Sequence, residues 1–241
     1  MALAPRFYRE WTNTSDLVTF TVSIKETDLQ IRARRDLTDC AVQAVRRVRR
    51  QLESYIAAVP AFLTSFSPLP RDLEAPIIVQ SMLDAGQEYG VGPMAAVAGA
   101  VAQEVGRELL EYSPDVIVEN GGDIFLMMSR PVTLALYAGE GSPFTRRIAL
   151  KLECAGQPRG VCTSSATVGP SVSFGRADAV VIIADSAPLA DAAATGVANR
   201  IRSPEDLNRV LEAEQARGRL LGCVAVIGKH LGAYGDVEIV G

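Results

Sequence analysis

The chain has 241 residues, enough for one large domain or two closely packed halves with a sizeable buried core. Hydrophobic residues make up 48% and charged residues 22%, values near the globular averages that argue against extensive disorder. The net charge of −4 and the lack of a basic tail argue against nucleic-acid binding, which requires cationic side chains that neutralise phosphates.

The same sequence argues against a membrane segment or a metal-binding cysteine motif. The longest apolar run, Val91–Ala102, is interrupted by Gly92 and Pro93 and is shorter than the roughly 20 residues that span a bilayer. The N-terminus lacks the charged and apolar regions of a signal peptide. The four cysteines show no Cys-x-x-Cys spacing, which fits reduced thiols. We therefore expect a cytoplasmic protein.

The first part of the chain predicts a β-hairpin followed by a long helix. Leu17–Ile24 is rich in β-branched residues, and Leu29–Ala33 pairs with it through the polar turn at Lys25–Asp28. From Thr38 to Pro60, apolar residues recur three or four positions apart, which predicts an amphipathic helix.

The clearest break in the pattern is Ser67-Pro68-Leu69-Pro70. We predict a single domain over residues 1–241, with an internal subdivision at residues 67–75. Two helices follow the break. One covers Pro76–Glu88 and ends at Gly90, and the other covers Met94–Leu110 and is rich in alanine and glycine.

The rest of the chain combines strands with two further helices. Short apolar runs predict strands at Val116–Glu119, Ile124–Met128, Val132–Tyr137, Ile148–Leu152, Ala179–Ala184, Val224–Ile227 and Val237–Val240. The continuous apolar run at Ala179–Ala184 is typical of a buried central strand. Helices are predicted over Leu189–Ile201 and from the capping box at Ser203–Asp206 to Arg217. This mixture predicts a layered fold of the α+β or mixed α/β class.

Asn120-Gly121-Gly122-Asp123 is the first segment that could carry chemistry. Two glycines permit positive φ and close approach of a ligand, and the flanking amide and carboxylate offer hydrogen bonds. An ordinary β-hairpin turn between two strands accounts for the same residues. Both interpretations stay open.

The second segment runs from Gly160 to Gly169, which we interpret as a polar loop. The thiol of Cys162 and the hydroxyls of Thr163, Ser164 and Ser165 could bind a phosphate or a ring carbonyl. The alternative is a polar loop that begins with a buried cysteine, and for Cys162 we favour this alternative.

The third segment is Ala190-Asp191-Ala192-Ala193-Ala194-Thr195. Asp191 and Thr195 are four residues apart and share one face of a helix. Their hard oxygens form a partial ligand set for Mg²⁺. Alternatively, Asp191 complements the helix dipole and Thr195 bonds back to a carbonyl. His230 is the only histidine, and its glycine-containing surroundings predict a surface loop.

The order of these segments from Gly90 to Ile201 resembles the ApbE family of FAD:protein FMN transferases, in the form of a compact branch of the ApbE-like superfamily. The Ala-Asp-Ala-x-Ala-Thr element at 190–195 is its most specific match. The resemblance implies an ApbE-like fold with two packed halves around a central cleft. It also implies that Asp191 and Thr195 bind Mg²⁺, together with a backbone carbonyl near Ala95–Val97.

The resemblance further implies that the Gly-Gly-Asp and Thr-Ser segments line an FAD cleft. The implied cofactor-binding residues are Asn120, Gly121, Gly122, Asp123, Cys162, Thr163, Ser164 and Ser165. The implied reaction is transfer of FMN from FAD to a protein threonine, with Mg²⁺ stabilising charge on the pyrophosphate.

The sequence also departs from the family pattern. The His-Ile-Ile-Asp-Pro segment of the transferases is replaced by Pro170–Gly175, and Ala98 stands where the family has a lysine. We therefore expect Mg²⁺-dependent binding of a flavin or another pyrophosphate-containing nucleotide, without efficient FMN transfer and with no catalytic residue assigned. The alternatives are a non-catalytic binding or sensing module, or a protein of anaerobic sulfur assimilation that uses Cys162. A homodimer stays open.

Overall fold

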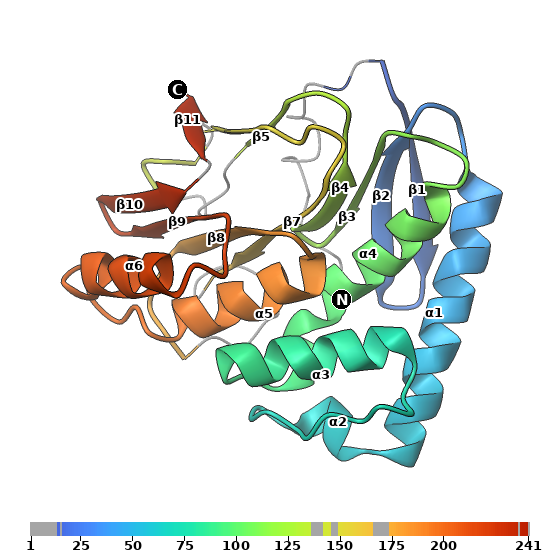
Figure 1. Ribbon diagram of the computed structural model, residues 1–241, viewed down its shortest axis with the longest axis horizontal. Coiled ribbons are helices and arrows are strands. Elements are labelled where there is room, and N and C mark those ends of the chain that lie inside the picture. Colours follow the sequence, from blue (N-terminus) through green and yellow to red (C-terminus); the bar gives the residue numbers. More distant parts are fainter. Residues whose placement is uncertain are drawn as a thin grey trace.

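Two sheets and a layer of helices make up the molecule, as a computed structural model shows (Figure 1). It describes residues 14, 16–135, 142–145, 149–165, 174–235 and 237–240. The helices cover one face of an eight-stranded sheet, and a three-stranded sheet packs against part of the other face. The mixed α+β fold predicted from the sequence is therefore confirmed.

Every pair of neighbouring strands in both sheets is antiparallel. The large sheet has, in spatial order, β1 (Val18–Ile24), β2 (Thr27–Ala33), β3 (Val116–Asn120), β4 (Asp123–Met127), β7 (Pro158–Ser164), β8 (Ala179–Ala184), β9 (Gly222–Ile227) and β10 (His230–Gly235). The small sheet has β11 (Glu238–Val240), β6 (Ala149–Leu152) and β5 (Val132–Ala135). All residues of β8 are buried, which confirms the predicted central strand.

The helices follow the order of the strands that they cover. They are α1 (Thr38–Ala58), α2 (Ala61–Thr64), α3 (Ile77–Tyr89), the 3₁₀ helix η2 (Pro93–Ala96), α4 (Val97–Leu109), α5 (Ala187–Ala198) and α6 (Asp206–Arg217). Helix α1 packs on β1, α4 on β3 and β4, α5 on β7 and β8, and α6 on β9 and β10. Helix α3 packs against α4 and α5 (Figure 1). No helix among the described residues is long and apolar enough to cross a membrane.

The side chains of the large sheet alternate between its two faces and form two separate hydrophobic cores. The larger core lies between the helices and the large sheet and contains Phe125 and Cys162. The smaller core lies between the two sheets and contains Leu126 and Val161. Because successive side chains of a strand point to opposite faces, neighbours in sequence enter different cores.

Small residues bring α5 unusually close to the sheet. Six alanines of α5 are buried, and a Cβ built on Gly160 of β7 would lie only 2.4 Å from the Ala187 Cα. Helix α5 therefore lies almost directly on the backbone of β7, and it also contacts β4.

Two of the predicted loops are strands. The polar segment that contains Cys162–Ser164 forms β7. Its sequence does not show the alternation expected of a strand, because small residues are needed beneath α5. His230 begins β10, and a Cβ at Gly232 of this strand would lie 2.5 Å from Leu211 Cδ1 of α6. The lack of room for a side chain beneath α6 therefore explains Gly232, the glycine that suggested a loop. His230 itself is exposed, as predicted.

The remaining predicted elements are present with shifted ends. Helix α5 begins two residues before Leu189, and the predicted helix at Met94–Leu110 is a 3₁₀ turn followed by α4. The predicted strand residues Tyr137 and Ile148 lie outside the described residues. Residues 67–75 connect α2 and α3, and the prediction of one domain over residues 1–241 stays a prediction.

Candidate functional site

Three of the segments selected from the sequence meet where α4 begins. Asn120 ends β3, Asp123 begins β4, and Asp191 lies in the first turns of α5. Hydrogen bonds connect Asn120 and Asp191 to the same short backbone stretch, Ala98–Gly99. We call Asn120, Asp123, Cys162 and Asp191 the α4 cluster.

Asp191 caps the N-terminus of α4 from a neighbouring helix. Its Oδ2 accepts a hydrogen bond from Gly99 N at 2.9 Å, and its carboxylate also accepts one from the N–H of Ala98. The N-cap residue of α4, Ala96, supplies no side-chain cap of its own. The carboxylate therefore satisfies two of the N–H groups that a helix start leaves without a partner.

Gly99 is required for this contact. A Cβ at this position would lie 2.5 Å from the Ala187 carbonyl oxygen and 3.0 Å from the Asp191 Cβ. Any other side chain would push α5 away from α4 and lengthen the bond to the carboxylate.

The Gly121-Gly122 segment forms the hairpin turn between β3 and β4. Both glycines have positive φ, 71° and 105°, and Gly122 N donates to Glu119 Oε1 at 2.8 Å. The turn therefore accounts for the two glycines. It also aims Asn120 at α4, where its Nδ2 donates to the Ala98 carbonyl at 3.1 Å. The hairpin interpretation is thus confirmed, while a ligand-binding role for these residues stays a prediction.

Asp123 and Asp191 are close enough to influence each other's protonation. Asp123 is buried and accepts a hydrogen bond from Thr163 N at 3.2 Å. Burial raises the pKa of Asp123 well above its usual range, and the charge of Asp191 raises it further. Burial also raises the pKa of Asp191 to about 7, although the N–H groups of Gly99 and Ala98 oppose the shift. Among the described residues, neither carboxylate forms a salt bridge.

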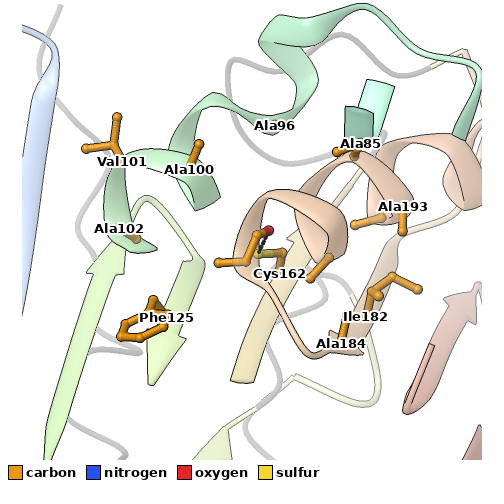
Figure 2. Close-up of a cluster of buried hydrophobic side chains, with 14 of the residues drawn as sticks. Ala85, Ala96, Ala100, Val101, Ala102, Phe125, Cys162, Ile182, Ala184 and Ala193 are labelled. Carbon is orange, nitrogen blue, oxygen red and sulfur yellow. Dashed lines mark hydrogen bonds between the residues drawn. The ribbon is translucent and has the colours of Figure 1, made fainter. Parts of the chain in front are cut away.

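Cys162 is a core thiol. It is fully buried, and its Sγ donates to the Ala187 carbonyl at 3.4 Å. Figure 2 shows its side chain against α5, in the cluster that also holds Phe125, Ile182 and Ala193. Burial raises its pKa well above the usual range, and the charge of Asp123 adds to this effect. A sulfur-carrying thiolate needs a lowered pKa and access to solvent, so the structure argues against that role.

All four cysteines are free, as expected for reduced thiols. Cys154 and Cys162 lie in the two different cores, on opposite sides of the large sheet. They are therefore not positioned to form a disulfide.

The three hydroxyls after Cys162 do not form one surface. Along β7, Ser164 shares the helix-covered face with Cys162, whereas Thr163 shares the other face with Val161. Thr163 contributes its backbone N–H to the α4 cluster. Ser165 directly follows the strand and is partly exposed. The loop interpretation is wrong for residues 160–164, because they form a strand whose successive side chains point to opposite faces. A cofactor-binding role for Thr163, Ser164 and Ser165 stays a prediction.

Thr195 lies one turn after Asp191 on the same side of α5, as the i, i+4 spacing predicts. Its side chain is partly exposed. Asp191 and Asn120 contact the backbone of Ala98 and Gly99, and a metal-binding role for a backbone carbonyl near Ala95–Val97 stays a prediction. Within the described ranges, no group of three or more histidine, cysteine or acidic side chains is arranged to hold a metal. A metal ion at this position would need oxygens from the backbone or from a ligand in addition to the side chains of Asp191 and Thr195.

Sequence reasoning missed the proximity of Asp123 and Asp191 and the role of Gln103. Gln103 of α4 is buried, and its Oε1 accepts from Ala187 N at 2.9 Å, which caps the start of α5. Helices α4 and α5 therefore cap each other. The only sequence signal for this arrangement is Gly99 inside a helical pattern, which is a recognised sign of close packing.

The comparisons with known proteins agree with this fold. The family model described as AbpE bacteria matches residues 9–227. The UPF0280 protein of Methanococcus aeolicus is 39% identical over 222 residues, which cover 90% of this chain and 89% of that protein. The UPF0280 protein of Methanothermobacter thermautotrophicus is 42% identical over 194 residues, or 78% of this chain and 75% of that protein.

Solved structures with the same fold are more distant in sequence. The apo flavinyl transferase ApbE of Pseudomonas stutzeri has a TM-score of 0.60 at 13% identity, covering 90% of this chain and 94% of that one. The ApbE protein of Thermotoga maritima has a TM-score of 0.54 at 14% identity, covering 92% and 96%. At such identities the likeness establishes the fold alone. Together with the family model and the UPF0280 relatives, these matches show that the chain belongs to the ApbE-like superfamily, in the branch of the UPF0280 proteins.

Proposed function

We propose that the α4 cluster binds a flavin or another pyrophosphate-containing nucleotide together with Mg²⁺, and that the chain does not transfer FMN efficiently. One observation carries this proposal: Asp123 and Asp191 are two neighbouring carboxylates of raised pKa without a salt bridge among the described residues. A bound divalent cation would lower the electrostatic cost of ionising both. The flavin class is suggested by the names of the solved structures that share the fold.

The donor set fits magnesium in its usual mode of binding. Mg²⁺ is commonly held by one or two carboxylates, with its remaining positions filled by water and ligand phosphates. Asp191 uses Oδ2 to cap α4, and Thr195 offers a hydroxyl oxygen one turn away. When bound, the metal would supply positive charge to a pyrophosphate.

The helix start offers little to a phosphate without that metal. The N–H groups of Ala98 and Gly99, which would otherwise attract an anion, already donate to Asp191. A nucleotide phosphate at this site would also approach two acidic side chains. Binding should therefore depend strongly on Mg²⁺.

Among the described residues, the cluster lacks the histidine that the transferases use near their site. A positioned base contributes roughly 10²–10⁴-fold to rate in proton transfer. The histidine-bearing segment of the transferases is replaced by Pro170–Gly175, and the single histidine, His230, begins β10. Strand β10 is three strands away from β7 in the large sheet, or about 14 Å at ordinary strand spacing. We further propose a cytoplasmic location, with a homodimer as the alternative to a monomer.

Equilibrium titration of the full chain with FAD, FMN and ADP, each with and without Mg²⁺, tests the binding. We expect Mg²⁺-dependent binding that Asp191→Ala weakens at least tenfold, because a metal ligand and the cap of α4 are both lost. His230→Ala is the matched control and should leave the affinity unchanged. Binding that is equal with and without Mg²⁺, or unaffected by Asp191→Ala, would refute the site.

A second assay tests the absence of transfer. Purified protein, FAD, Mg²⁺ and a threonine-containing peptide should yield no flavin-labelled peptide on a timescale of hours. Binding without turnover would leave a ligand-binding or sensing module as the function. Rapid labelling that Asp191→Ala abolishes would show instead that the missing histidine segment is dispensable.

A further inference from the structure

A second cluster of buried polar groups lies under α6, and the proposed nucleotide site does not use it. It contains Tyr89 at the end of α3, Glu214 on α6 and Tyr234 on β10. We call these three residues the α6 cluster. Each carries a buried oxygen that has no hydrogen-bond partner in the described part of the chain, namely Tyr89 Oη, Glu214 Oε2 and Tyr234 Oη. Such atoms are rare in native proteins, and three of them in one place call for a shared partner.

Packing places Tyr234 beside Glu214. A Cβ on Gly232 of β10 would lie 2.5 Å from Leu211 Cδ1 of α6, so this strand runs directly beneath the helix. Tyr234 follows two residues later on the same face of the strand, and Glu214 follows Leu211 by nearly one helical turn. The two side chains therefore extend into the same space.

Arg217 connects Tyr89 to the same space. Its guanidinium carbon lies 4.7 Å from the centroid of the Tyr89 ring, and its Nη1 donates to Glu214 Oε1 at 3.4 Å. Burial raises the pKa of both Tyr89 and Tyr234, and the charge of Glu214 raises the pKa of each as well, which supports their closeness to the carboxylate.

The charges around Glu214 restrict what could bind. Glu214 is fully buried, and its Oε1 also accepts from Arg200 Nη2 at 2.6 Å. Two guanidinium groups would repel a cation, and the carboxylate would repel an anion. The remaining oxygen of Glu214 needs a donor, whereas two phenols need an acceptor. A single water molecule offers both.

We propose that Tyr89, Glu214 and Tyr234 bind one internal water molecule that links α3, α6 and β10. The water donates to Glu214 Oε2 and accepts a hydrogen bond from each phenol. These three hydrogen bonds are the usual number for a buried water.

Removing each phenol oxygen tests the proposal through stability. For the full chain in urea, Tyr89→Phe and Tyr234→Phe should each raise the unfolding equilibrium constant about 3- to 10-fold, the ordinary effect of one lost hydrogen bond. The matched control is Tyr112→Phe, whose ring is largely exposed and which should change the constant less than about 2-fold. The double variant should fall short of the product of the single effects, because both phenols share one partner.

The opposite change in stability is expected if no water is bound. An oxygen that is truly without a partner costs free energy in the folded state, so its removal would leave stability unchanged or increase it. Either of these results in both single variants overturns the proposal. Exchange of sodium for ammonium at constant ionic strength should leave the urea midpoint unchanged, and a rise in the midpoint would identify a cation instead of water. A high-resolution crystal structure should show solvent density within about 3.2 Å of all three oxygens, and its absence refutes the site.

Discussion

The α4 cluster and the α6 cluster both bury acidic side chains, but they compensate the charge in different ways. In the α4 cluster, Asp191 is stabilised by backbone N–H groups at a helix start and has no salt bridge among the described residues. In the α6 cluster, Glu214 is paired with the guanidinium groups of Arg200 and Arg217. The charge of Asp191 is therefore balanced by backbone dipoles, whereas that of Glu214 has two cationic partners.

This difference indicates which cluster has capacity for a ligand. A site whose charges are already paired gains little from a charged ligand and is suited to a structural role. A site with two acidic groups and only backbone donors gains free energy when a cation arrives. We therefore assign the functional site to the α4 cluster and a structural water to the α6 cluster, although both are polar and buried.

The largest expected effect that separates the clusters is the pH dependence of stability. The pKa of Asp191 is about 7 in the folded chain and 3.8 in its ordinary state, so the folded chain binds this proton more tightly. Stability should therefore fall as pH rises from about 4 to about 7, by up to about 1.4 kcal/mol per pH unit.

Urea denaturation at several pH values would measure this slope, which Asp191→Asn should reduce, while the raised pKa of Asp123 contributes the remainder. Asp206→Asn is a control of opposite sign. The Arg209 hydrogen bond lowers the pKa of Asp206, so its contribution is lost as pH falls. An unchanged slope in Asp191→Asn would contradict the account of the α4 cluster.

Neutralising the other carboxylate should have the opposite effect on stability. Glu214→Gln removes the negative charge of the acceptor from the hydrogen bonds with Arg200 and Arg217, and we expect a loss of roughly 1.5–3 kcal/mol at pH 7. Measured at the same pH, Asp191→Asn should be neutral or stabilising. If both variants lost stability equally, the distinction between the two clusters would fail.

The position of Asp191 at the start of α4 depends on how closely α5 approaches β7, and Gly160→Ala tests this. The added Cβ would lie 2.4 Å from Ala187 Cα, which is backbone and has little freedom to move, so we expect a loss of about 1–3 kcal/mol. Gly90→Ala is a matched comparison with open space around the Cβ, where only its φ of +68° is unfavourable. Thermal denaturation should rank Gly160→Ala as the more damaging change.

The smallest expected effect is that of Mg²⁺ alone. At tenfold excess over its dissociation constant, the metal should stabilise the wild-type chain by about 1.4 kcal/mol, since it binds only the folded site. Denaturation with and without Mg²⁺ measures this shift at pH 8. The same addition should not stabilise Asp191→Asn, and an equal shift in both proteins would place the metal elsewhere.

Local chemistry in the sequence was enough to predict most elements. The helix from Thr38, the hairpin turn at Gly121-Gly122 and the central strand Ala179–Ala184 follow from periodicity, turn residues and continuous apolar character. These signals depend on neighbours within a few positions, so one sequence contains them. The order of the motifs also indicated the ApbE-like superfamily.

The tertiary structure alone decided what the site residues do. Whether Cys162 was a loop residue or a core residue depended on how closely α5 packs on β7, and no local pattern encodes that distance. Likewise, Asp191 became the cap of α4 because two helices far apart in the sequence start beside each other. The raised pKa of Asp123 and that of Asp191 arise from burial, and the nearby charge of Asp191 adds to the shift of Asp123; both causes are properties of the assembled fold. A sequence supplies the carboxylates, but only the packing around them determines whether they are paired, protonated or available to a metal.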